Sequence, residues 1–82
     1  MLFELTHHAR HALEERKIAL DWVERVLANP EQIEPHEFDP ELEHRFGKIV
    51  EQGGRVLHIV VATGHPERVV TAYFDRTRKG TP

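Results

Sequence analysis

The feature of this chain that most restricts its fold is a succession of three β-rich segments in its second half. They read HRFGKIVEQ, RVLHIVVAT and RVVTAYFDR, and each is alternating or rich in β-branched residues. Gly53-Gly54 lies between the first two segments, and residues 64–67 lie between the second and the third. Because both connections have hairpin length, the pattern predicts an antiparallel meander. The short apolar segment at residues 2–5 is a candidate edge strand.

The first third of the chain has a helical period instead. Thr6 is a favourable N-cap for a first helix. That helix places a row of apolar residues on one side: Leu5, Ala9, Ala12 and Leu13. A second helix is predicted over residues 20–28, since Asp21 suits its first turn and Asn29-Pro30 is a stop signal. The two helices therefore form a hairpin.

The rest of the chain completes the expected architecture. Residues 30–43 contain three prolines and six acidic residues, and they are predicted to be a loop with at most a short extended piece around Ile33. The expected fold class is α+β, with an N-terminal helical hairpin packed on one face of a three- to four-stranded antiparallel sheet. With 82 residues the chain can form one small core, so we expect a single domain over residues 1–76. Residues 77–82 are basic, lack apolar anchors and are predicted to be a flexible tail.

Composition limits the compartment and the chemistry. The absence of cysteine excludes disulfides, thiolate zinc sites and a cysteine nucleophile, and it suits a reducing compartment. No apolar run approaches the roughly 20 residues of a transmembrane helix, and no secretory leader precedes the first polar segment. We therefore expect a cytoplasmic protein without a membrane partner.

Charge is distributed unevenly along the chain. The net charge of −3 argues against a strongly basic nucleic-acid binder. Residues 1–43 carry 4 Lys and Arg against 11 Asp and Glu, whereas residues 44–82 carry 7 against 3. The positive C-terminal half can attract a phosphate backbone, although charge alone favours the alternative of a solvated surface.

A strand register follows from the two connections. A two-residue loop at Gly53-Gly54 pairs Gln52 with Arg55, and the four-residue loop pairs Thr63 with Arg68. The predicted core face then contains Phe46, Val50, Leu57, Ile59, Val61, Val70, Ala72 and Phe74. The predicted open face contains Arg45, Gly47, Ile49, His58, Val60, Thr71 and Tyr73.

The predicted open face contains side chains that can transfer protons or bind phosphate. His58 lies across from Tyr73, and Arg45 and Thr71 lie on the same face. A guanidinium can stabilise the charge that develops on a phosphorane, an imidazole or a phenol can move protons, and an aromatic ring can stack on a base. These groups suit metal-independent cleavage of a phosphodiester. The alternative is structural, because Tyr and Thr are frequent in strands for propensity reasons.

The first helix is rich in histidine. His7 and His11 stand four residues apart on the predicted solvent side, but no further ligand-rich segment completes a metal shell, so no metal site is predicted. His8 lies at the edge of the apolar row, and Arg16 points into it, where a charge requires a reason. In a structural role, Arg16 extends past the helix end or bonds acidic and carbonyl groups of the loop 30–43. In a functional role, it reaches a site at the boundary of helix and sheet.

Four segments resemble the motifs of a small bacterial family, domain-of-unknown-function family 4258. They are Thr6-His7-His8-Ala9, Arg16-Lys17-Ile18, the segment VERVLANP at residues 23–30, and Val69-Val70-Thr71-Ala72-Tyr73. The chain departs from the family pattern at Ala12, where a second arginine is frequent, and at Ala19, where Ser or Thr would cap the second helix.

The resemblance implies a fold similar to the RelE/ParE-type toxins, some of which cleave RNA without a metal. Of the candidate site residues, His8, Arg16, Thr71 and Tyr73 match the family's motif positions. Similarity of fold alone does not define a reaction.

These observations lead to two hypotheses. In the first, the chain is a toxin-like RNA-directed module without a cofactor, either a metal-independent endoribonuclease or an RNA-binding module. Arg45 and Arg16 would contact phosphate, His58 or His8 would transfer protons, and Tyr73 would stack or act as an acid. In the second, the chain is a non-catalytic domain that binds itself or an antitoxin-like protein, which the net negative charge and short edge strands favour.

Overall fold

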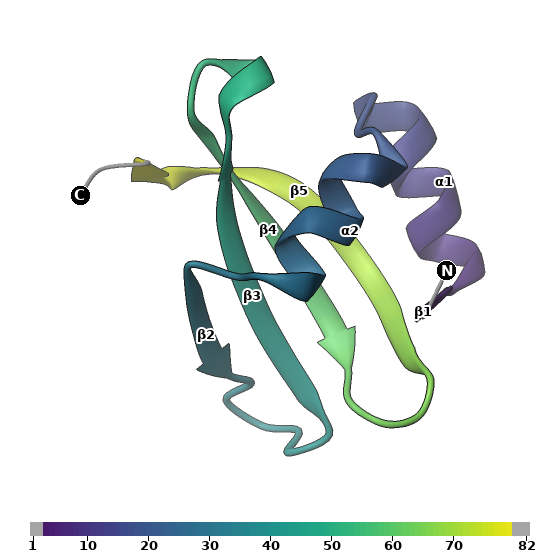
Figure 1. Cartoon of the computed structure of the whole chain (residues 1–82). Helices are drawn as coiled ribbons and strands as arrows, with labels where there is room; N and C mark the ends of the chain where they lie inside the picture. Colours follow the sequence, from purple (N-terminus) through teal and green to yellow (C-terminus); the bar gives the residue numbers. More distant parts are fainter. Residues whose placement is uncertain (1–2, 80–82) are drawn as a thin grey trace.

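The computed structural model describes residues 3–79 and contains two helices and one five-stranded sheet (Figure 1). The elements are β1 (Phe3–Leu5), α1 (His7–Arg16), α2 (Leu20–Ala28), β2 (Gln32–Pro35), β3 (Leu42–Ile49), a short 3-10 helix (Val50–Gln52), β4 (Arg55–Ala62) and β5 (Glu67–Lys79). The strand order is β1-β5-β4-β3-β2. The predicted α+β class and helical hairpin are confirmed.

The sheet is larger than predicted and is mixed. β1 pairs with β5 in parallel, whereas the other neighbours are antiparallel. The predicted number of three to four antiparallel strands is therefore wrong. The extended piece around Ile33 is long enough to pair with β3 as the outer strand β2, where Pro35 at its end is tolerated.

Local capping defines both ends of α1. The Thr6 hydroxyl accepts a hydrogen bond from the Ala9 N–H at 3.0 Å, which confirms the predicted N-cap. At the other end Lys17 adopts the left-handed conformation, with φ 55°. The Ile18 N–H donates to the Leu13 carbonyl at 2.9 Å, and both side chains are buried. This is a Schellman motif with its hydrophobic contact, and it turns the chain sharply into α2.

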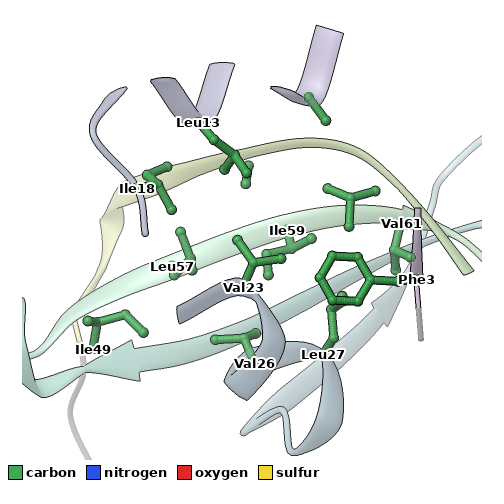
Figure 2. Packing of buried hydrophobic residues seen from close by; sticks show 13 residues of the cluster. Phe3, Leu13, Ile18, Val23, Val26, Leu27, Ile49, Leu57, Ile59 and Val61 are labelled. Atoms are coloured by element: carbon green, nitrogen blue, oxygen red, sulfur yellow. The ribbon is translucent and has the colours of Figure 1, made fainter. Parts of the chain in front are cut away.

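Both helices cover one face of the sheet, and the core lies between them and β4 (Figures 1 and 2). The fully buried side chains include Val23 of α2 and Leu57, Ile59 and Val61 of β4. α2 packs directly over Gly47 of β3, where a Cβ would lie 2.9 Å from Val26 Cγ2. Glycine at this position therefore permits the close approach of helix and sheet.

The predicted register of β3 is wrong by three residues. Val50–Gln52 form a 3-10 turn, and Gly53 and Gly54 close it with positive φ, so that Ile49 rather than Gln52 pairs with Arg55. An odd shift moves each side chain to the opposite face. Ile49, Gly47 and Arg45 consequently face the helices, whereas Phe46 lies on the open face and Val50 is exposed.

The predicted register of β4 and β5 is confirmed in its central part. His58 pairs with Tyr73 and Val60 with Thr71. A bulge after Val60 then shifts the pairing by one residue. Because of it, Val69 rather than Val70 is buried opposite Val61, and Arg68 pairs with Ala62 rather than Thr63.

Arg45 is buried on the helix side rather than on the open face. Its Nε donates to Glu43 at 2.6 Å, and its Nη1 donates to Glu67 at 3.0 Å and to the Leu27 carbonyl at 3.2 Å. A second bond joins Nη2 to Glu67. The hydrogen bond from Arg45 lowers the pKa of Glu67, and the same contact raises the pKa of Arg45. The predicted role of Arg45 at an open face therefore rests on a wrong placement.

β5 extends three residues into the segment 77–82 that was predicted to be a tail. Residues 80–82 of that segment lie outside the described residues. Within the part of the chain that the structure describes, no helix is long and apolar enough to cross a membrane.

The left-handed Lys17 gives a first prediction. We expect Lys17→Gly to raise the free energy of unfolding by about 0.5–1 kcal/mol, because glycine adopts this conformation without a Cβ penalty. The matched control is Arg10→Gly in the exposed middle of α1, which we expect to cost about 1 kcal/mol. Urea denaturation measures both, and a loss of stability in Lys17→Gly would contradict the assignment of this C-cap.

The Arg45 contacts give a second prediction. We expect Arg45→Ala to lower the free energy of unfolding at neutral pH by about 2 kcal/mol, since it leaves buried acceptors without a donor. Arg68→Ala is the control, because the pair of Arg68 and Glu4 is exposed and should contribute about 0.5 kcal/mol or less.

The same variant tests the pH dependence. The pKa of Glu67 is depressed in the folded state, so its stabilisation is complete above the ordinary value of 4.5 and is lost as pH falls through the folded pKa. The difference in free energy of unfolding between the wild type and Arg45→Ala should therefore become smaller below about pH 4, as measured by urea denaturation. A difference that stays constant down to pH 2 would contradict this assignment.

Candidate functional site

The open face of the sheet, which neither helix covers, brings polar and aromatic side chains of three strands together. We refer to six of them as the histidine face: His44 and Phe46 of β3, His58 of β4, and Thr71, Tyr73 and Asp75 of β5. Two register relations create it, since His58 pairs with Phe46 on one side and with Tyr73 on the other.

His58 is the centre of the histidine face. Its side chain is only 8% exposed although no helix lies over it. Neighbouring rings provide the cover, with centroids at 4.2 Å for Phe46, 4.7 Å for Tyr73 and 4.9 Å for His44. Burial lowers the pKa of His58, and the Asp75 carboxylate opposes this effect. The imidazole is therefore neutral at pH 7.

A hydrogen-bonded chain runs through both nitrogens of His58. Its Nδ1 lies 3.1 Å from Asp75 Oδ2, and its Nε2 lies 2.6 Å from His44 Nδ1. Hydrogen bonds from the hydroxyl and the N–H of Thr77 lower the pKa of Asp75, so the carboxylate is ionised and can only accept. His58 must then donate through Nδ1 and accept through Nε2.

The same logic assigns the tautomer of His44. Since His58 Nε2 accepts, His44 donates through Nδ1, and its own Nε2 carries the free lone pair. The chain from Asp75 through His58 thus orients a basic nitrogen at the half-buried His44. This arrangement can perform general base catalysis.

Tyr73 provides a proton donor beside the chain. Its ring packs against His58, and 36% of the residue is exposed. Burial and the negative charge of Asp75 raise the pKa of the phenol. The phenol therefore remains protonated at physiological pH and can act as an acid or a hydrogen-bond donor.

Arg16 reaches the histidine face from the end of α1. Its Nη1 donates to the Ala72 carbonyl at 3.0 Å and contacts the Thr71 hydroxyl at 3.4 Å. Thr6 at the other end of the helix donates to the Val70 carbonyl at 3.2 Å. The pairing of β1 with β5 ends at Val69, and side chains at the two ends of α1 provide hydrogen bonds to carbonyls of β5 after that residue. Arg16 thus lies at the boundary of helix and sheet, and its hydrogen bonds go to β5 rather than to the loop 30–43. That it serves a site there stays a prediction.

A second arginine, Arg78, lies over the face from the end of β5. Its guanidinium carbon is 3.9 Å from the centroid of Phe46. Its Nη2 donates to both carboxylate oxygens of Glu34 at 2.9 Å, and its Nε is 3.8 Å from Asp75. This pairing joins β5 to the outer strand β2 across the open face.

The remaining candidates from the sequence lie elsewhere. His8 is exposed in the first turn of α1, about 12 Å along the helix axis from Arg16. His7 and His11 are exposed as predicted, and His11 lies 3.4 Å from Glu15. Among residues 3–79, no group of three or more His, Asp or Glu side chains is arranged to hold a metal ion.

The sequence placed Thr71, Tyr73 and His58 on one face and left the partner of Arg16 open, and it did not place His44 or Asp75 with them. The wrong register of β3 placed His44 on the helix side and its neighbour Arg45 on the open face, whereas the structure has the reverse. Asp75 was within reach, because it follows Tyr73 by two residues on the same strand and alternation gives both the same face.

Comparison with known proteins agrees with the motifs in the sequence. The family model of a domain of unknown function, DUF4258, matches residues 5–74. The comparisons with curated proteins and with solved structures gave no match. The matched range includes α1, α2 and most of the histidine face, and Asp75 follows directly after it. Because the match covers most of the chain, the protein belongs to the DUF4258 family.

Proposed function

We propose that the histidine face is the site of a metal-independent endoribonuclease with a RelE-like, toxin-like role. The observation that carries this proposal is the chain Asp75–His58–His44 beside Tyr73 and Arg16. It supplies a base, an acid and a cation on one accessible side of the sheet. RNA is a cytoplasmic substrate, which fits a chain without cysteine.

The chemistry follows from the protonation states. His44 Nε2 accepts the proton of a ribose 2′-hydroxyl, and the 2′-oxygen attacks the adjacent phosphorus. The bond to the 5′-oxygen breaks, and the Tyr73 phenol gives that oxygen a proton, so that a 2′,3′-cyclic phosphate and a free 5′-hydroxyl result. Arg16 stabilises the charge on the non-bridging oxygens. After the products leave, water carries the proton from His44 Nε2 to the Tyr73 phenolate, which restores both groups.

The alternative, a non-catalytic domain that binds itself or an antitoxin-like protein, is favoured by a different surface. The outer strand β2 leaves one edge of the sheet without a partner within residues 3–79. Ile33 on this strand is 52% exposed, and Phe38 in the loop that follows is 83% exposed. Such an edge can accept a strand from another chain. A complex that forms at this edge, without RNA binding at low salt, would favour this alternative.

Cleavage of RNA in the presence of EDTA tests the proposal. We expect the wild type to cleave single-stranded RNA to products with 2′,3′-cyclic phosphate ends, and not to cleave the DNA of the same sequence. His44→Ala, His58→Ala and Tyr73→Phe should each reduce the rate by about 10²–10⁴-fold. His11→Ala is the matched control, since His11 is exposed on α1 and should leave the rate unchanged. Failure of the wild type to cleave any RNA would overturn the proposal.

The pH profile of cleavage tests the role of Asp75. The carboxylate raises the pKa of His58, so its removal in Asp75→Asn lowers that pKa further. The chain of His58 and His44 acts as a base only while it holds no extra proton, so the acid limb of kcat/KM should move to lower pH when the pKa of His58 falls. The plateau should also fall, because the tautomer is no longer fixed. In the wild type the plateau should remain flat to about pH 9, since the pKa of Tyr73 is raised. An acid limb that moves to higher pH in Asp75→Asn would exclude the proposed chain.

A further inference from the structure

A hollow with an excess of positive charge lies where the C-terminal end of α1 meets the start of β4 and the second half of β5. We refer to it as the basic hollow, and it has a volume of about 540 Å³. Its lining residues are Arg16, Lys17, Gln52, Arg55, Tyr73, Phe74 and Arg76. Four of these seven side chains are cationic, and none is a carboxylate.

The cations of the basic hollow differ from most other cations of the protein in their partners. Arg25, Arg45, Arg68 and Arg78 each form an ion pair with at least one carboxylate. In contrast, the ion pairs among residues 3–79 do not include a residue of the basic hollow. Arg16 donates to the Ala72 carbonyl, and Arg55 lies over the Phe74 ring at 4.3 Å. Both contacts orient a guanidinium without neutralising it.

This charge arrangement is unusual for an acidic chain. The protein has 14 Asp and Glu against 11 Lys and Arg, so carboxylates are in excess. An adjoining hollow of about 380 Å³ shares Arg55 and Arg76 and also includes Asp75, whose carboxylate already accepts from Thr77 and His58. Four uncompensated cations around one hollow attract an anion with more than one negative charge.

Tyr73 connects the basic hollow to the histidine face. It lines the hollow and also packs against His58 at 4.7 Å between ring centroids. An exposed aromatic ring beside a row of cations is the usual arrangement for a single strand, because the cations hold phosphates and the ring stacks on an unpaired base. A paired base presents no free face to such a ring.

We propose that the basic hollow binds backbone phosphates of a single-stranded RNA, next to the phosphodiester that lies at His44. The strand passes over Tyr73 and places a neighbouring phosphate between Lys17, Arg55 and Arg76. The position of the cleaved bond rests on the proposed function, whereas binding in the hollow can be measured without cleavage.

The test is binding of a short fluorescein-labelled oligouridylate with 2′-O-methyl groups, which cannot be cleaved through the 2′-oxygen. Fluorescence anisotropy across a salt series gives the affinity and its salt dependence. We expect the double variant Lys17→Gly and Arg76→Gln to weaken binding about tenfold at low salt. It should also reduce the slope of log K against log salt by about 1.4, which corresponds to two lost phosphate contacts on a single strand.

Two controls make the result specific to the basic hollow. The first is the double variant Arg10→Gln and Lys48→Gln, which removes two exposed cations outside the hollow and should bind as the wild type does. The second is His11→Ala, which removes an exposed imidazole of α1 outside the hollow and should bind within about twofold of the wild type. Glycine suits the left-handed conformation of Lys17. Weaker binding of the double variant Lys17→Gly and Arg76→Gln therefore cannot be attributed to loss of the α1 cap.

Each outcome decides for or against the basic hollow. An unchanged slope in Lys17→Gly and Arg76→Gln, or the absence of salt-dependent binding by the wild type, overturns the proposal. Tighter binding of an RNA duplex than of the single strand overturns the assigned ligand class. If the wild type binds RNA but does not cleave unmodified RNA, the proposed ribonuclease is overturned and RNA binding in the basic hollow is supported. If the wild type cleaves RNA and the double variant has an unchanged KM, the ribonuclease is supported and RNA binding in the basic hollow is overturned.

Discussion

The buried Arg45 determines which side chains of β3 can face solvent. Its guanidinium joins the end of α2 at the Leu27 carbonyl to β3 at Glu43 and to the start of β5 at Glu67. A guanidinium that donates to two carboxylates and a backbone carbonyl fits the helix side, and Gly47 of the same strand lets α2 approach closely. Because side chains alternate along a strand, the same contacts direct His44 and Phe46 to the open face. A residue without a place in the proposed chemistry thereby positions two members of the histidine face.

α1 has a comparable double role. Thr6 and Arg16 stand at its two ends, and each donates to a carbonyl of β5 where no further strand pairs. The edge of the sheet is therefore covered by side chains of a helix instead of by backbone. The Schellman motif at Lys17 ends the helix at the position from which Arg16 reaches Thr71. The cations of the basic hollow thus depend on the helix cap as well as on the strands.

The sequence predicted those parts of the structure that local chemistry determines. The cap at Thr6 depends on residues that lie close together in the chain. The facing of His58 and Tyr73 agrees with the prediction although Arg68 pairs with Ala62 instead of Thr63, because the bulge after Val60 shifts the pairing by one residue. The register of β3 was not accessible in this way, because Gly53-Gly54 fits a two-residue hairpin as well as the closing end of a 3-10 turn. β1 depends on β5, a partner distant in sequence, whereas β2 pairs with the next strand, β3, within the segment predicted to be a loop. His44 was missed as a consequence of the register, and so was the structural role of Arg45.

A buried polar chain on the uncovered side of a sheet needs a physical reason. Phe46 and Tyr73 exclude water from His58 as an apolar core does, yet the group they enclose is an imidazole bonded to a carboxylate. Aliphatic residues at these positions would fill the space without a desolvation cost. Enclosure strengthens the field that Asp75 exerts along the chain. The proposed ribonuclease accounts for this arrangement, because a general base at His44 is served by a charge held in the interior and a basic nitrogen at the end of the chain.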